Sequence, residues 1–232
     1  MAAGRAAGHL HGLPGCDDPP VEVVTASHVV TPHSGVIVHR TKRLPAEQII
    51  TIEGIRSTSI ERTLLDLCGV MVKRKAAIAL DNALMRGLTT LGSIDHCLFL
   101  TARRGRNGCG VLRDLMKARV GLNTAPNSPL ETVIHEMLFE SSLPIPVLQH
   151  VITDDTGVFV ARPDFLYPEE KLIIEGHSKT WHWGERAESR DLEKHNKLLA
   201  LGYSIMYVTW QDATTYRERT VATIARLLTA AA

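Results

Sequence analysis

The chain has 232 residues, 44% of them hydrophobic and 22% charged, and a formal net charge of +1. These are values of an ordinary globular protein, and the length suits a domain of about 100–110 residues with a smaller partner. The small net charge excludes a globally basic nucleic-acid-binding chain, so any such binding must come from local patches.

Four cysteines are scattered along the chain without a C-x-x-C pair: Cys16, Cys68, Cys97 and Cys109. We interpret them as reduced, mostly buried thiols of a cytoplasmic protein, and not as a disulfide framework or a zinc site. The first 15 residues contain too few apolar side chains for a signal peptide. No apolar run approaches the roughly 18 residues that a membrane span needs, so no membrane partner is expected.

Residues 1–55 are predicted to form a small β-rich segment. Leu10 to Pro14 is typical of the end of a helix with a glycine stop. Three short apolar runs follow at a spacing typical of hairpins, with proline and glycine between them. They are 21–24, 36–39 and 49–52.

Residues 56–125 are predicted to be helical. Thr58 and Glu61 form a capping-box pattern before a leucine-rich run, and further helices are expected over 76–85, 91–100 and 111–120. A basic loop over 103–108 contains Arg103, Arg104 and Arg106. Contact with phosphates and a simply solvated loop both remain open for it.

Residues 126–232 are predicted to form the second domain. Ser128, Pro129 and Glu131 give a strong helix start, with a serine cap and a proline in the first turn. Strands are expected over 147–152, 158–166, 171–175 and 204–208, and later helices over 186–201 and 216–228. The order α-β-β-β-α-β-α predicts an α+β domain in which helices cover a mixed sheet.

Two carboxylates are predicted to face each other in this domain. If the runs around Phe165 and Ile174 pair as a hairpin about Glu169 and Glu170, Asp164 lies opposite Glu175. Like charges placed so closely are destabilising without a cation between them. Mg²⁺, with Mn²⁺ as an alternative, is the first candidate, because it takes one or two carboxylates and keeps its waters.

Glu131 is a third candidate ligand, since the metal of a phosphodiesterase needs several oxygen ligands to activate water. Each acid also has a purely structural explanation: Glu131 as part of a capping box, and Asp164 as a strand-end cap. His177 lies two residues beyond Glu175 and is expected on the same face of the strand, where it could assist a water or a phosphate. His182 could be a general base or a phosphate ligand, or only a polar tip between two tryptophans.

Basic residues follow these acids. Lys179 lies in the loop, and the next predicted helix carries a one-sided basic stripe at steps of four and three. Such a stripe suits a phosphate backbone, and a solvated helix face is the alternative. The stripe consists of Arg186, Arg190, Lys194 and Lys197.

These blocks, in this order, resemble the endonuclease-related domains similar to very-short-patch-repair (Vsr) endonucleases, within the PD-(D/E)XK, restriction-endonuclease-like group. The matching blocks are RPDFLYPEEKLIIE, S-x-x-x-H and LLALGYSIMYVTW, and the resemblance covers about residues 126–230. It implies an αβββαβ core and Mg²⁺-dependent DNA cleavage, with Asp164 and Glu175 as the signature acids and Glu131 as the helix acid. The signature usually has lysine where this chain has His177.

The upstream half resembles actinobacterial proteins that join an AbiEi-type antitoxin-like N-terminus to such a nuclease-like domain. The resemblance rests on LHGLPG, VIVHR and TSIERTLLDL, and it implies a winged helix upstream, which this chain is expected to lack through truncation or a misplaced start. Two functions therefore stay open: a metal-dependent DNA endonuclease or nickase, and a non-catalytic antitoxin-like or regulatory DNA-binding protein with a toxin or antitoxin partner. A fold resemblance cannot separate them, because function lies in the site.

Overall fold

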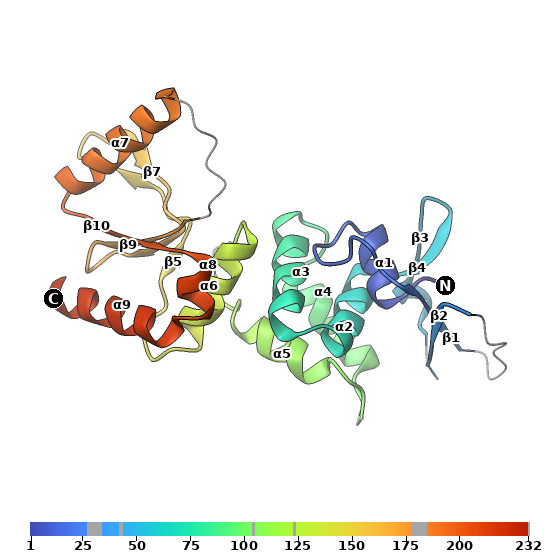
Figure 1. Cartoon of the computed structure of the whole chain (residues 1–232). Coiled ribbons are helices and arrows are strands. Elements are labelled where there is room, and N and C mark those ends of the chain that lie inside the picture. The colour runs from blue at the N-terminus through green and yellow to red at the C-terminus, as the bar shows by residue number, and fades with distance from the viewer. Residues whose placement is uncertain (27–33, 42–43, 104, 123, 178–184, 232) are drawn as a thin grey trace. The chain divides into compact units, whose positions relative to one another are not determined.

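The computed structural model describes residues 1–26, 34–41, 44–103, 105–122, 124–177 and 185–231, with only the backbone described for 185–191 and 231. The chain divides into two compact units, Met1–Val120 and Gly121–Ala232 (Figure 1). The segments predicted over 1–55 and 56–125 thus lie, apart from 121–125, in the first unit. None of the described helices is long and apolar enough to cross a bilayer.

The first unit begins with helix α1 (Gly4–Leu10) and two pairs of strands. Strands β1 (Val21–Thr25) and β2 (Val36–Arg40) pair in parallel, so the hairpin that their spacing suggested is wrong. A two-residue hairpin turn joins only antiparallel strands, so the ten residues between β1 and β2 must carry the chain back to the start of the pair. Strands β3 (Ile49–Ile52) and β4 (Ile55–Thr58) form a true hairpin.

Four helices complete the first unit: α2 (Ile60–Val70), α3 (Lys73–Met85), α4 (Leu91–Thr101) and α5 (Cys109–Lys117). The predicted helical segment therefore begins with a strand, β4, and Ser59 rather than Thr58 caps α2. Their buried faces form one core, in which Leu65, Leu80 and Leu112 are fully buried. Each of the four cysteines is a free, buried thiol, as expected.

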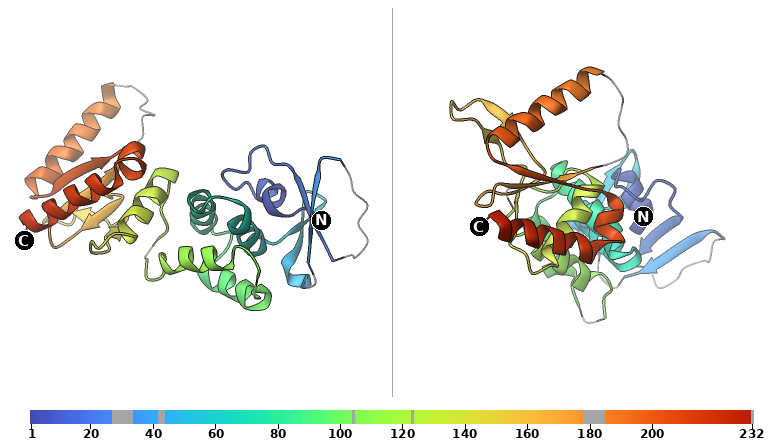
Figure 2. Two further views of the ribbon diagram at one scale, coloured as in Figure 1. Left: turned by 60° about the horizontal axis from the view of Figure 1, so that its bottom comes forward. Right: turned by 60° about the vertical axis from the view of Figure 1, so that its left-hand side comes forward.

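The second unit has a four-stranded mixed sheet in the order β10-β9-β8-β5. Strand β10 (Ser204–Val208) runs parallel to β9 (Leu172–Gly176), and β8 (Phe165–Tyr167) runs antiparallel to both β9 and β5 (Val147–Leu148). Helices α6 (Pro129–Phe139), α8 (Trp210–Thr214) and α9 (Arg217–Ala231) pack together, and α7 (Glu185–Ala200) lies on the other side of the sheet (Figures 1 and 2). The predicted α+β class is confirmed.

Two of the strands expected in this unit are broken. The run 147–152 divides into β5 and β6 (Ile152–Thr153), because Gln149 between them has a left-handed backbone with φ 50°. The run 158–166 divides into β7 (Phe159–Ala161), which pairs with β6, and β8. The short helix α8 was not expected, and Thr209 caps it through a capping box with Asp212.

Alternation along the strands decides what each side chain faces. Leu166 and Ile173 pack against Leu198 of α7. The residues on either side of them point to the opposite face of the sheet, where α6 lies against β9. Within β9, any residue two positions from Ile173 therefore faces α7, and this rule locates the candidate site.

Candidate functional site

The β8–β9 hairpin brings two carboxylates to one end of the sheet. Leu166 pairs with Ile173, so the predicted register is confirmed. In that register Asp164, just before β8, lies opposite Glu175 near the end of β9. Glu175 is two residues from Ile173, so its side chain lies on the α7 side. Asp164 precedes β8, and its Oδ2 lies beside Gly176 together with Leu130 of α6.

The two oxygens of Asp164 have different partners. Oδ2 accepts a hydrogen bond from the backbone N–H of Gly176 at 2.8 Å, and Oδ1 accepts one from Nε2 of Gln149 at 3.2 Å. The same Nε2 also donates to Oε2 of Glu131 at 3.0 Å. A single amide group therefore links the helix acid to the strand acid.

Glu131 reaches this amide from the first turn of α6. The Ser128 hydroxyl accepts from the N–H of Glu131 at 3.1 Å, and the Glu131 carboxylate accepts from the N–H of Asn127 at 2.9 Å. Ser128 therefore caps α6, but the Glu131 carboxylate accepts from Asn127, the residue before the cap, so the reciprocal bond of the expected capping box is not the one formed. The same carboxylate reaches Gln149. Burial, followed by the neighbouring charge of Asp164, raises the pKa of Glu131, and its hydrogen bonds oppose the rise.

Gln149 is the residue that sequence reasoning missed. Its N–H donates to the carbonyl oxygen of Asp164 at 3.1 Å, and its Oε1 accepts from Nε of Arg162 at 3.0 Å. The left-handed backbone of Gln149 ends β5. A lone amide inside an apolar run was the available signal, and the bend itself has no simple sequence signature because non-glycine residues rarely adopt it.

Glu175 is held by a cation from α7. Nζ of Lys194 lies 3.1 Å from Oε1 of Glu175, and the Glu175 side chain is 17% exposed. Burial and the charge of Asp164 raise the pKa of Glu175, and Lys194 opposes the rise. Lys194 was predicted as a phosphate contact. In the structure its ammonium group contacts Glu175, and the predicted contact with phosphate stays a prediction.

His177 comes directly after β9, two residues beyond Glu175, and belongs to a small aromatic cluster. Its ring meets the ring of Tyr207 edge-on at 5.8 Å, and the ring of His195 stacks on Tyr207 at 6.4 Å. Tyr207 is the register partner of Glu175. The cluster thus extends the α7 side of the site onto β10, and neither Tyr207 nor His195 was singled out from the sequence.

Three other side chains predicted to contact nucleic acid are described, and two of them form ion pairs within the chain. Nζ of Lys197 lies 2.8 Å from Oε1 of Glu193 on the same helix. In the first unit, Nη2 of Arg106 lies 2.7 Å from Oδ1 of Asp66, and its side chain is 12% exposed. Arg103 is exposed. The roles predicted for all three stay predictions.

Several predicted residues lie outside the described part of the chain. This holds for Lys179 and His182, and for Arg104 in the basic loop of the first unit. Arg186 and Arg190 lie on the backbone of α7, but their side chains are not described.

Metal ligation is the remaining question about the acids. Within the described ranges, no three His, Cys, Asp or Glu side chains are arranged so that they could hold a metal ion as they stand. Asp164 and Glu175 by themselves supply two carboxylates from neighbouring segments of the sheet. Mg²⁺ commonly binds one or two carboxylates and keeps several waters. The residues present therefore fit a cation bound by two carboxylates and water.

Comparison with known proteins adds relatives but no function. Two proteins of Mycobacterium tuberculosis, from strains CDC 1551 / Oshkosh and H37Rv, are 28% identical to the chain over 197 residues. The match covers 85% of this chain and 69% of each relative, and both relatives are described only as uncharacterized. No family model matches the chain, and no solved structure matches it.

Proposed function

We propose that the chain is a metal-dependent DNA endonuclease or nickase, and that its second unit has the restriction-endonuclease-like αβββαβ core. The observation that supports this most is the opposition of Asp164 and Glu175 across a β-hairpin, with the pKa of Glu175 raised. Two partly buried like charges cost stability, and a divalent cation between them removes that cost.

Asp164 and Glu175 would hold Mg²⁺ or Mn²⁺, and Glu131 would orient them through Gln149. The bound ion would polarise the scissile phosphate and favour hydroxide at neutral pH. Glu175 must then exchange its contact with Lys194 for the ion. Lys194 is well placed for this, because its side chain is 40% exposed and carried on a flexible stem.

Lys194 and His177 would act on the phosphate. His177 stands where the resembled signature usually has lysine, and Lys194 brings an ammonium group to the same carboxylate from α7. Once freed from Glu175, that group can donate to a phosphate oxygen. His177, two residues further on the same face, can exchange a proton with water or with the leaving oxygen.

DNA would be held by the basic side of α7, and His182 and Lys179 remain proposed members of the site. Arg186, Arg190, Lys194 and Lys197 share that helix at steps of four, four and three. Free thiols at all four cysteines support a reducing compartment such as the cytoplasm.

One observation favours the alternative, a non-catalytic antitoxin-like or regulatory DNA-binding protein. Within the described residues the acid pair is already supplied with donors: Lys194 to Glu175, and Gly176 and Gln149 to Asp164. Carboxylates whose hydrogen-bond donors all come from their own chain can serve to hold the fold together and need no metal ion. On this alternative, DNA and a toxin or antitoxin are binding partners, and no bond is broken.

The experiment that separates these functions uses supercoiled plasmid with Mg²⁺, with Mn²⁺ and with chelator. We expect metal-dependent nicking by the wild type, and its loss in Asp164→Ala and in Glu175→Ala. Glu169→Ala, which removes an exposed acid from the turn of the same hairpin, should leave nicking unchanged. No metal-dependent nicking by the wild type, or nicking that survives both site substitutions, would overturn the enzyme proposal.

A further inference from the structure

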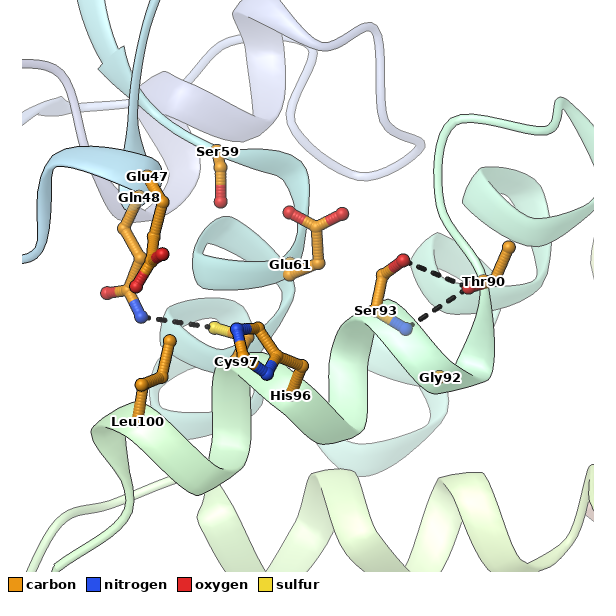
Figure 3. Close-up of a pocket in the computed structure, with 10 residues that line it drawn as sticks. All are labelled: Glu47, Gln48, Ser59, Glu61, Thr90, Gly92, Ser93, His96, Cys97 and Leu100. Atoms are coloured by element: carbon orange, nitrogen blue, oxygen red, sulfur yellow. Dashed lines mark hydrogen bonds between the residues drawn. The ribbon is translucent and has the colours of Figure 1, made fainter.

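The first unit contains an open cavity of about 500 Å³ that the proposed nuclease site does not use. It lies between the 3₁₀ turn η1 (Ala46–Gln48), the start of α2 and the exposed face of α4 (Figure 3). Its lining includes the side chains of Glu47, Glu61 and His96, together with the thiol of Cys97. In Figure 3, Glu47 and Glu61 lie on opposite sides of the opening, and His96 projects from α4 below them.

The two glutamates of this cavity have no ion-pair partner among the described residues. Glu61 accepts a hydrogen bond from the hydroxyl of Thr89 at 2.8 Å, a neutral partner. The guanidinium group of the neighbouring Arg62 is directed to Asp66 and to Oε1 of Gln48. Arg106 pairs with the same Asp66, so neither guanidinium group forms an ion pair with Glu47 or Glu61.

The floor of the cavity offers additional polar groups. Ser59 is 7% exposed, and its hydroxyl accepts only a long bond of 3.4 Å from the N–H of Arg62. In Figure 3 that hydroxyl points into the opening between the two glutamates. Leu100 adds an apolar wall. A cavity of this size with a few convergent polar groups and an apolar side is the common form of a small-molecule site.

We propose that this cavity binds an organic cation that carries a guanidinium or a primary ammonium group. Two carboxylates and a hydroxyl on three sides accept the several N–H donors of such a group, and the apolar wall accommodates its aliphatic stem. A bare metal ion fits less well, since no three ligating side chains in the described part of the chain are close enough to hold one. The site is independent of the proposed nuclease activity.

Isothermal titration of the full chain with three cations tests the site: free arginine, 1,4-diaminobutane and a Gly-Arg-Gly tripeptide. Binding of arginine and the tripeptide alike identifies a side-chain guanidinium as the recognised group, and preference for the diamine identifies a free amine. Nα-acetylcitrulline, in which a neutral ureido group replaces the guanidinium and the α-amine is blocked, is the ligand control and should not bind. No binding of any cation at millimolar concentration, or equal binding of arginine and Nα-acetylcitrulline, overturns the proposal.

Matched variants locate the binding. Glu61→Gln keeps the acceptor for Thr89 and should weaken binding about tenfold or more, the effect of losing a charge-assisted hydrogen bond. Glu47→Gln, at an exposed position, should weaken it about threefold. Glu53→Gln removes an exposed charge from the β3–β4 turn of the same unit and should change nothing. Equal effects of all three substitutions would overturn the assignment to this cavity, and circular dichroism checks that each variant is folded.

Discussion

Glu175→Gln should stabilise the protein while it removes the proposed activity. At about 5 Å and an effective dielectric constant of about 20, two unit charges repel by about 3 kcal/mol. The substitution also loses the ion pair with the half-exposed Lys194, which contributes about 0–1 kcal/mol. We therefore expect the free energy of unfolding to rise by about 1–2 kcal/mol at pH 7 after partial screening of the repulsion.

The stability difference between the wild type and Glu175→Gln should depend on pH. The folded-state pKa of Glu175 is raised, so its contribution to stability is fully present below its unfolded pKa and is lost as pH rises through the folded value. Between the unfolded-state pKa and the folded-state pKa of Glu175, the wild type should lose stability relative to Glu175→Gln as pH rises. At lower pH the carboxyl is protonated in both states, and the pH-dependent part of the difference should vanish.

Urea unfolding followed by tryptophan fluorescence measures the effect, because all three tryptophans lie in residues 121–232. Glu193→Gln on α7 is the control. Its pKa is lowered by the hydrogen bond from Lys197, so its contribution is present above the unfolded pKa and is lost as pH falls. A Glu175→Gln variant that is less stable than the wild type at pH 7, or a difference that does not change with pH, would refute the account of two opposed charges.

Three further predictions concern contacts elsewhere in the fold. Asp81→Asn should destabilise the first unit by about 3–5 kcal/mol, because it leaves Arg119 buried beside a neutral partner; hydrogen exchange of the first unit checks this. Gln149→Gly fits the left-handed backbone but loses the amide that bridges two carboxylates, so a loss of about 1–3 kcal/mol in urea unfolding is expected, and no loss would deny the bridge a role. Burial raises the pKa of Cys16 to about 11 and of Cys68 to about 12, so a thiol reagent at pH 8 should label them only after denaturant is added; rapid labelling of the native chain would contradict their burial.

The sequence alone determined the elements whose signals are local. The serine cap and proline of α6, the end of α7 before Gly202 and the bounds of β10 each depend on a few neighbouring residues, and each was predicted within a residue or two. The opposition of Asp164 and Glu175 was predictable for the same reason, because a short hairpin with a polar turn fixes its own register.

Only the tertiary structure decided what surrounds those acids. The bend at Gln149 depends on a hydrogen bond to Asp164, 15 residues away, and the contact of Lys194 with Glu175 depends on how α7 packs on the sheet. The parallel pairing of β1 and β2 likewise depends on contacts that no local pattern encodes. Interactions between distant segments are set by packing, so the pair of charges could be predicted from a local pattern, whereas their partners could not.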